Sequence, residues 1–317
     1  GPPGGGRRRA AVSGPRVVWT DVSPRDGLQN LADPAPTDVK VRLVRGLLAA
    51  GLPRVEAASF VSPRAVPQMA DAAEVLRSLD GEPLGRLRVL VPNLRGFEDA
   101  VRSGVRNVVV TVAATDTFNR RNVRRSVAES LEELRRIVDA ARGAGVVVDV
   151  ALSVAFGCPF EGRVDRTVVV GLCDELSAIG AAEVCVADTI GVADPAAVRE
   201  LCASLLDGHL TVRSLALHVH DTRGLGVANV VAAFDAGVRR FEGSAGGLGG
   251  CPFAPRSTGN VCTEDSIGAL VALGAETGVD LEALCEVARR LGSDLGLALP
   301  GKLHRAGVWH PELAASA

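Results

Sequence analysis

The 317-residue sequence contains no tyrosine, and aromatic residues make up only 3 % of it. Proteins that bind single-stranded nucleic acids stack bases on aromatic side chains, and this sequence offers few of them. A formal net charge of −2 gives no electrostatic reason to expect nucleic acid or an anionic membrane as a partner. No apolar run reaches the roughly 18 residues that indicate a membrane-spanning helix. We therefore expect neither nucleic-acid nor membrane partners.

Lysine is nearly absent, occurring only as Lys40 and Lys302. An aldolase that forms a Schiff base needs a lysine as its nucleophile. Lys40 falls within a predicted helix and Lys302 lies near the C-terminus, so neither stands at the end of a predicted strand. Carbon–carbon chemistry in this chain would therefore depend on a bound metal ion as the electrophile.

Cysteine occurs seven times with irregular spacing, and no two cysteines form a CxxC pair. This pattern argues against a disulfide framework and against a zinc knuckle. It predicts reduced thiols in a cytoplasmic protein, most of them filling the core. Cys251 is the exception, because it falls in a glycine-rich segment. The other six are Cys158, Cys173, Cys185, Cys202, Cys262 and Cys285.

Residues 1–16 are rich in Gly, Pro and Arg and contain no apolar stretch. Such a segment cannot bury a hydrophobic face, so we expect a disordered N-terminal segment or a tag remnant. Although it is Arg-rich, it lacks the amphipathic pattern of a transit peptide, and we do not expect mitochondrial targeting. We expect a folded domain over residues 17–306 and a C-terminal tail over residues 307–317.

Short runs rich in Val, Leu and Ile alternate with longer amphipathic stretches after residue 16. Several of the short runs lack polar alternation, which is typical of strands buried on both faces. The predicted strands cover residues 17–22, 54–60, 87–92, 107–113, 146–155, 183–189, 214–220 and 239–244. The predicted helices cover residues 38–50, 70–79, 96–103, 126–143, 166–179, 195–206, 226–236, 263–273 and 281–291.

Eight strand-then-helix units follow one another without a Pro/Gly/Ser-rich linker, which indicates one domain with a parallel sheet. Eight units in roughly 250 residues match the size of a (β/α)₈ TIM barrel, here with a C-terminal helical extension. A doubly wound open sheet is the alternative. That fold would place a Gly-rich dinucleotide turn after the first strand, and residues 23–27, SPRDG, are not one.

Polar residues stand where predicted strands end, which is where a TIM barrel carries its active site. His218 and His220 lie two residues apart on the seventh strand and therefore share a face. Asp26 follows the first strand, and Asn260 precedes the eighth helix. Two imidazoles, a carboxylate and an amide oxygen would favour Mg²⁺ or Mn²⁺. Taken alone, the histidines could be satisfied core residues and Asn260 a loop or cap residue.

Arg25 would lie in the same barrel mouth, where its guanidinium could hold an enolate or carboxylate oxygen. Taken alone, Arg25 and Asp26 would more often form a surface ion pair. The segment 243–252 contains Gly249 and Gly250 beside Cys251 and is typical of a mobile lid. A thiol near a metal ion and histidines could transfer protons, and the alternative is a glycine hinge with an incidental cysteine.

Two acidic residues interrupt otherwise apolar strands, namely Glu56 in the second and Asp188 at the end of the sixth. A buried carboxylate needs a partner, which Arg25 and the metal ion would provide. Structural ion pairing is the alternative interpretation for each of these two acids.

Six segments of the chain, taken together, resemble the hydroxymethylglutaryl-CoA lyase family, within the superfamily of metal-dependent barrel lyases and Claisen-type condensing enzymes. The resemblance covers about residues 17–306, and its signatures recur in the family's order. They are SPRDGLQN (23–30), SFVSPRAVPQMAD (59–71), GCPFEG (157–162), DTIGVADP (188–195), HVHDTRG (218–224) and GLGGCPFA (247–254).

The resemblance implies retro-Claisen cleavage of 3-hydroxy-3-methylglutaryl-CoA to acetyl-CoA and acetoacetate by a homodimeric, Mg²⁺- or Mn²⁺-dependent enzyme. It implies that Arg25 stabilises the enolate and that Cys251 moves a proton on the lid. Further implied roles fall to three groups of residues: Asp26, His218, His220 and Asn260 would hold the metal, with His218 also catalytic; Glu56 and Asp188 would act in catalysis; and Gln29, Glu264, Gly249 and Gly250 would bind substrate or support the site.

Three alternatives remain at this stage. Asp21, Leu31 and residues 115–116 and 255–256 depart from the family pattern, which leaves the acyl group open to a close 3-hydroxyacyl-CoA. An aldolase or condensing enzyme of the same superfamily, acting on a 2-oxo acid, is a second interpretation. A barrel that has lost catalysis and serves as a binding protein is the third, and it predicts no stoichiometric metal.

Overall fold

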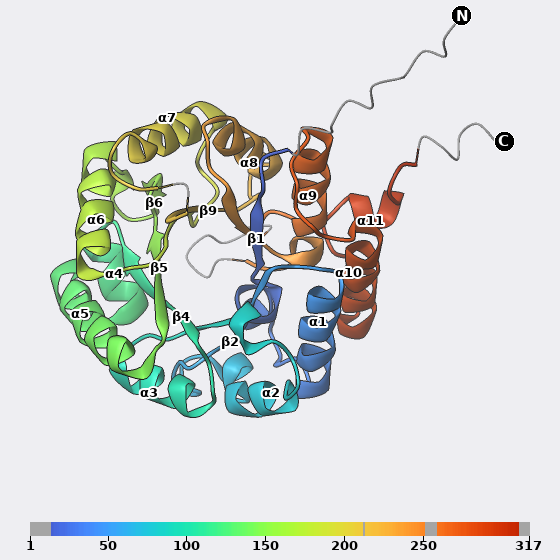
Figure 1. Cartoon of the computed structure of the whole chain (residues 1–317), viewed down its shortest axis with the longest axis horizontal. Helices are drawn as coiled ribbons and strands as arrows, with labels where there is room; N and C mark the ends of the chain where they lie inside the picture. The colour runs from blue at the N-terminus through green and yellow to red at the C-terminus, as the bar shows by residue number, and fades with distance from the viewer. Residues whose placement is uncertain (1–13, 212, 251–258, 311–317) are drawn as a thin grey trace, which may run out of the picture.

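A closed barrel of eight parallel strands forms the centre of the computed structural model, which describes residues 14–211, 213–250 and 259–310 (Figure 1). The strands are paired in the order β1-β10-β9-β8-β5-β4-β3-β2. Their bounds are β1 Val18–Asp21, β2 Arg54–Ser59, β3 Leu87–Leu90, β4 Asn107–Ala113, β5 Val147–Ser153, β8 Val184–Asp188, β9 Leu215–Val219 and β10 Arg240–Gly243.

Helices surround the barrel as an outer ring (Figure 1). Each follows a strand, apart from the second helix between β4 and β5 and the helices of the C-terminal extension. They are α1 Thr37–Ala49, α2 Ala72–Ser78, α3 Leu94–Arg102, α4 Asp116–Val123, α5 Val127–Ala144, α6 Arg166–Ile179, α7 Pro195–Leu206, α8 Gly226–Asp235, α9 Thr263–Ala272, α10 Leu281–Leu295 and α11 Leu303–Ala306. Among the described residues, no helix is long and apolar enough to cross a membrane.

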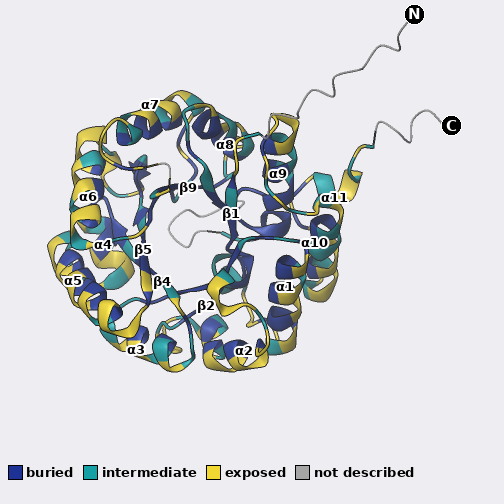
Figure 2. Ribbon diagram, viewed as in Figure 1, coloured by how far each residue is buried: buried dark blue, intermediate teal, exposed yellow. Residues whose placement is uncertain are grey.

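The burial pattern explains why the strand sequences lack polar alternation. Every residue of β2, β3, β8 and β9 is buried, because helices cover the outside of these strands and side chains fill the barrel. The helices instead bury one face and expose the other, and Figure 2 shows dark blue buried residues and yellow exposed residues on the same helices. Helix α5 illustrates how sequence sets an element's limits: Ser126 and Glu129 form a capping box at its start, and Gly145 ends it at φ 63°.

The predicted barrel is confirmed, and the closed strand order excludes the open doubly wound sheet. Helix α10, which packs beside α1, provides the predicted C-terminal helical extension. The prediction missed α4, α11 and a small hairpin of β6 (Gly157–Cys158) and β7 (Gly162–Arg163). It also began the second helix at residue 70, whereas a 3₁₀ turn, Pro67–Met69, comes first.

Candidate metal centre at the barrel mouth

The segment after β1 carries Arg25 and Asp26 on a single π-helical turn, Ser23–Gly27. The backbone amides of Asp26 and Gly27 both donate to the carbonyl of Val22, over 2.7 and 3.2 Å. Pro24 suits the first turn of such a helix, since no intrahelical acceptor is available there for the amide that proline lacks. Wide turns of this kind recur at functional sites, and this one presents two adjacent side chains at the carboxyl end of β1.

Three side chains meet at this mouth with the geometry of a metal site. One ligand atom each from Asp26, His218 and His220 lies within 4.8 Å of the others. The two imidazoles come from β9 and the isolated bridge that follows it, and their ring centroids are 5.2 Å apart. Residues two apart on a strand share a face, which is why the HVH sequence brings both rings to one place.

Asn260 joins this cluster from a distant part of the chain. It forms an isolated antiparallel bridge with His220, and Val261 donates to the carbonyl of Val219 over 3.0 Å. Asn260 Nδ2 donates to Asp26 Oδ2 over 2.9 Å and to the carbonyl of Leu248 over 3.2 Å. These two bonds fix the amide so that Oδ1 is the atom left over.

Two buried atoms of the cluster have no hydrogen-bond partner among the described residues, namely Asn260 Oδ1 and His220 Nδ1. Buried polar atoms are rarely left unpaired, and each costs about 1–3 kcal/mol when it is. Both atoms are potential metal ligands next to the Asp26 carboxylate. The mixed oxygen and nitrogen donors therefore fit a hard or borderline divalent cation, which would satisfy atoms that the protein leaves without partners.

The protonation states also suit a cation. Burial, and then the nearby His218, lowers the pKa of His220 to about 3, so its ring is neutral at physiological pH. Burial alone would raise the pKa of Asp26, but the positive charge of Arg25 and the neighbouring imidazoles outweigh it and bring that pKa below its ordinary value. The cluster therefore offers one carboxylate and one neutral imidazole without any proton having to leave.

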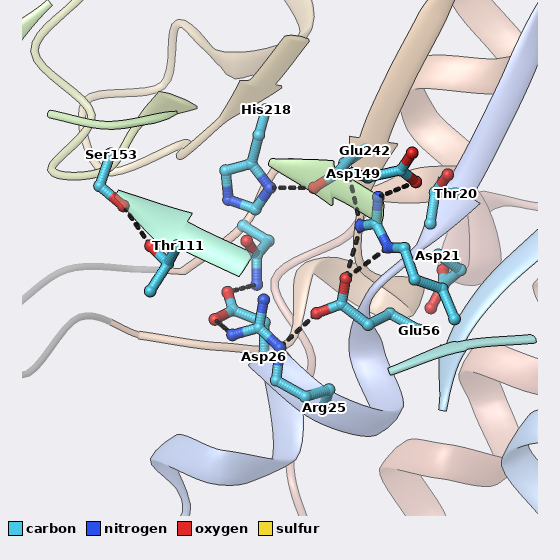
Figure 3. Close-up of polar contacts among 12 residues, drawn as sticks. Thr20, Asp21, Arg25, Asp26, Glu56, Thr111, Asp149, Ser153, His218 and Glu242 are labelled. Atoms are coloured by element: carbon cyan, nitrogen blue, oxygen red, sulfur yellow. Dashed lines mark hydrogen bonds and ion pairs between the residues drawn. The ribbon is translucent and has the colours of Figure 1, made fainter. Parts of the chain in front are cut away.

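Arg25 lies between two carboxylates, as Figure 3 shows. Its Nε donates to Glu56 Oε1, and its Nη1 lies 2.5 Å from Asp26 Oδ1. No described residue accepts a hydrogen bond from Nη2, so this nitrogen remains available to a ligand. Arg25 was predicted as the partner of Glu56, and the structure contains that ion pair.

Asp188 has different partners from those predicted. Its two carboxylate oxygens accept from the backbone amides of Val192 and Ala193, each over 2.9 Å, and not from Arg25. The acid therefore shapes the turn after β8. Burial nevertheless raises the pKa of Asp188 above its ordinary value, although the two amides and His218 act in the opposite direction.

Glu242 on β10 and Arg88 on β3 were not predicted from the sequence. Glu242 Oε2 lies 3.2 Å from His218 Nδ1 (Figure 3), and burial, outweighed by Arg88 and His218, leaves the pKa of Glu242 well below its ordinary value. An ionised carboxylate can only accept, so Nδ1 carries the proton and Nε2 keeps its lone pair for a metal. A charged residue inside a buried four-residue strand was the available signal for both.

Gln29 and the predicted lid residues surround this cluster. Gln29 Nε2 donates to Asp26 Oδ1 over 3.0 Å. Gly249 has φ 145°, and a Cβ there would lie 2.6 Å from Asn260 Nδ2. The carbonyl of Gly250 accepts from Asn30 over 3.2 Å. The backbone of Gly249 and Gly250 thus packs directly against Asn260 and Asn30.

Glu264 supports the start of that glycine segment. It is fully buried, and its carboxylate accepts from the backbone amide of Gly246 over 3.0 Å and lies 2.8 Å from His304 Nδ1. Residues 251–258, and with them Cys251, lie outside the described residues. The six cysteines predicted to fill the core are all buried and unpaired.

Comparisons with known proteins identify the family of the chain. Residues 16–291 match the family model described as HMGL-like. The chain is 42 % identical over 311 residues to (R)-citramalyl-CoA lyase of Chloroflexus aurantiacus, which spans 95 % of this chain and 98 % of that protein. It is 44 % identical over 281 residues to hydroxymethylglutaryl-CoA lyase of Pseudomonas mevalonii, spanning 88 % and 92 %. An HMG-CoA lyase from Acinetobacter baumannii, solved with coenzyme A and 3-methylmalate, has a TM-score of 0.87 at 38 % identity over 93 % of this chain and 97 % of that one.

Proposed function

This chain belongs to the HMGL-like family and is an oxo-acid lyase, and from that premise we propose that it cleaves 3-hydroxy-3-methylglutaryl-CoA to acetyl-CoA and acetoacetate. One observation carries the proposal. Asp26, His218 and His220 converge at the barrel mouth beside Arg25 Nη2 and Asn260 Oδ1, two atoms that have no partner among the described residues. A candidate metal site next to a guanidinium suits a reaction that forms an enolate.

Asp26, His218, His220 and Asn260 would hold a divalent ion, which we propose to be Mg²⁺ or Mn²⁺. The bound ion would supply a Lewis acid for the substrate hydroxyl and an adjacent oxygen. The protein's own task in this first step is to take the hydroxyl proton. His218 and Cys251 are the two candidate bases. Because Glu242 holds Nδ1–H of His218, the one lone pair of that ring, on Nε2, would serve either the ion or the proton, and Cys251 would be the base when His218 holds the ion.

Removal of that proton lets the bond between the hydroxyl-bearing carbon and the thioester methylene break. The hydroxyl-bearing carbon becomes the ketone of acetoacetate, and the bonding electron pair remains on the thioester as an enolate. Arg25 would donate Nη2–H to the enolate oxygen, because its other contacts hold it in place before the charge develops. Protonation of the methylene carbon, which we assign to Cys251, then gives acetyl-CoA.

A second substrate has support of its own. The similarity to (R)-citramalyl-CoA lyase extends over nearly the whole of both chains. In that substrate the carboxylate is attached directly to the hydroxyl-bearing carbon, so cleavage by the same steps gives acetyl-CoA and pyruvate, a 2-oxo acid. One methylene separates the two substrates, and a hydrophobic pocket discriminates a methylene by only about 10–200-fold.

Release of acetyl-CoA from a panel of thioesters tests the proposal. The panel contains 3-hydroxy-3-methylglutaryl-CoA, both enantiomers of citramalyl-CoA and a 3-hydroxyacyl-CoA without a carboxylate. We expect cleavage of one of the first two at kcat/KM of about 10⁴ M⁻¹s⁻¹ or more, and its loss when the protein is stripped of metal. Equal activity in the metal-stripped protein would contradict the proposal, and so would acetyl-CoA-dependent condensation without cleavage. The homodimer implied by the family resemblance stays a prediction, which sedimentation equilibrium would check.

A further inference from the structure

A closed ring of charged side chains connects the two halves of the site through the barrel interior. It runs from Arg25 to Glu56, from Glu56 to Arg88, from Arg88 to Glu242 and from Glu242 to His218. His218 lies beside Asp26, which contacts Arg25 again. The members come from β2, β3, β9, β10 and the turn after β1, so the ring ties five separate parts of the chain together.

Arg88 is the member of this ring that contacts both Glu56 and Glu242. Its Nε donates to Glu56 Oε2 over 2.8 Å, and its Nη2 lies 2.5 Å from Glu56 Oε2 and 2.5 Å from Glu242 Oε1. Its side chain is 1 % exposed and those of Glu56 and Glu242 are 0 % and 4 % exposed. Two carboxylates that share one guanidinium nitrogen would repel each other strongly without that charge.

The other oxygen of each acid faces a functional side chain. Glu56 Oε1 accepts from Arg25 Nε, and Glu242 Oε2 lies 3.2 Å from His218 Nδ1. Arg88 therefore holds one oxygen of Glu56 and one oxygen of Glu242. The second oxygen of Glu56 orients Arg25, and the second oxygen of Glu242 orients His218. Outer partners of this kind fix the ring orientation and basicity of metal-binding histidines.

Resting on the function proposed above, we infer that Arg88 is a positioning residue. It fixes the metal-binding imidazole of His218 and the enolate-binding guanidinium of Arg25 in their positions relative to each other. Its ion pairs within the described residues are with Glu56, Glu242, Asp149 and Glu183, and none is with a candidate metal ligand. It acts through Glu242 on the affinity for the ion and through Glu56 on the turnover of bound substrate. One substitution at Arg88 should therefore impair both properties, although it lies outside the mouth.

Arg54 provides a matched control inside the same barrel. It lies on β2, its side chain is 9 % exposed, and it pairs with Asp149 and Glu183, over 2.8 Å in the case of Asp149. No contact joins Arg54 to Glu56, Glu242 or any member of the candidate metal cluster within the residues that the structure describes. Among the described residues, Arg54 approaches the ring only through Asp149 and Glu183, whose carboxylates lie 3.7 and 3.6 Å from Arg88 Nη1. Loss of Arg54 should thus destabilise the barrel as loss of Arg88 does, while the closer contacts of Arg88 with Glu56 and Glu242 stay in place.

The experiment measures Mn²⁺ affinity, by electron paramagnetic resonance of free Mn²⁺, together with kcat and KM for the wild type, Arg88→Gln, Arg88→Lys and Arg54→Gln. Outer-shell substitutions cost about 10–100-fold in metal affinity or activity. We expect Arg88→Gln to weaken Mn²⁺ binding by that factor and to lower kcat at saturating Mn²⁺. Arg88→Lys should recover only part of both, because an ammonium is a point charge and cannot hold two carboxylates in a planar fork. Arg54→Gln should lower the melting temperature with Mn²⁺ affinity unchanged.

Each other outcome overturns the inference. Mn²⁺ affinity and saturated kcat near the wild-type values in Arg88→Gln would leave Arg88 with a structural role only. Equal losses in Arg88→Gln and Arg54→Gln would point to general loosening of the barrel. If Arg88→Gln does not fold, full function in Arg88→Lys overturns the inference equally, because a single point charge would then suffice. A wild-type protein that binds no Mn²⁺ would overturn the proposed function as well, whereas the other outcomes leave it standing.

Discussion

At the scale of single residues, the site combines groups with distinct electrostatic settings. His220 is neutral because it is buried, and Asp26 is ionised because Arg25 and the imidazoles offset its burial. Sequence reasoning found these residues because strand ends and the HVH spacing mark them. It could not find Glu242 or Arg88 in the same way, because a charge within a short apolar strand does not reveal which distant residue will pair with it.

Arg25→Gln should lower kcat by about 10²–10³-fold, the usual cost of losing one donor to a developing oxyanion. Glu56 retains Arg88 as its partner in this variant, so the fold should survive. Steady-state kinetics of acetyl-CoA release and a thermal melt measure the two effects. Turnover at the wild-type rate would remove Arg25 from the reaction.

His220→Ala should weaken Mn²⁺ binding by at least about tenfold, since loss of an outer-shell residue alone costs that much and we propose His220 as a direct ligand. His209→Ala is the control, because His209 is on the surface and Asp174 is its only ion-pair partner in the part of the chain that the structure describes. Calorimetric titration of the metal-free proteins compares them. Equal affinity in the two variants would exclude His220 from the ligand set.

At the scale of elements, the sequence predicted eight parallel strands and a closed barrel because buried parallel strands form Val-rich runs. It failed on α4, the β6–β7 hairpin and α11, which are short and depend on tertiary contacts. In one such contact, the backbone amide of Thr117 donates a hydrogen bond to Glu161 Oε1 over 2.9 Å, which joins α4 to the hairpin. The π-helical turn was equally hidden, since no residue pattern distinguishes it from an ordinary loop.

The glycine segment after β10 offers an element-level test. Gly249→Ala should displace Asn260, because the new Cβ would lie 2.6 Å from Asn260 Nδ2 and φ 145° is strained for alanine. We expect weaker Mn²⁺ binding and a loss of about 1–2 kcal/mol of stability. Gly250→Ala is the matched control. A Cβ at that position would lie 3.6 Å from the nearest described atom, Asn30 Cβ. Identical Mn²⁺ affinities would show that Gly249 does not position Asn260.

At the scale of the whole molecule, charged side chains fill the barrel interior beneath the site instead of apolar ones. Arg54, Arg88, Asp149, Glu183 and Glu242 are all buried there. Such ion pairs contribute little net stability, but removing one partner typically costs about 3–5 kcal/mol. The buried ion pairs are therefore better explained by how accurately they position the side chains at the barrel mouth than by a gain in stability. Which of these charged residues pair with one another cannot be read from the sequence.

The pH dependence of stability should report Asp21, which lies at the end of β1. Burial raises the pKa of Asp21 to about 6, although Ser23 and Thr263 donate hydrogen bonds to it. A folded pKa above the unfolded value favours the protonated form, so this residue costs stability as pH rises from about 4 to 6. Relative to Asp21→Asn, the wild type should lose about 2 kcal/mol between pH 4.5 and 7. Urea unfolding measures this, and a pH-independent difference would contradict the assigned environment.

The anomalous scattering of a crystal of the protein grown with Mn²⁺ tests the central claim most directly. The account predicts one Mn²⁺ ion bound by Asp26, His218, His220 and Asn260 Oδ1, with Glu242 still on His218 Nδ1. An ion bound elsewhere, or no ion at this mouth at saturating Mn²⁺, would contradict it.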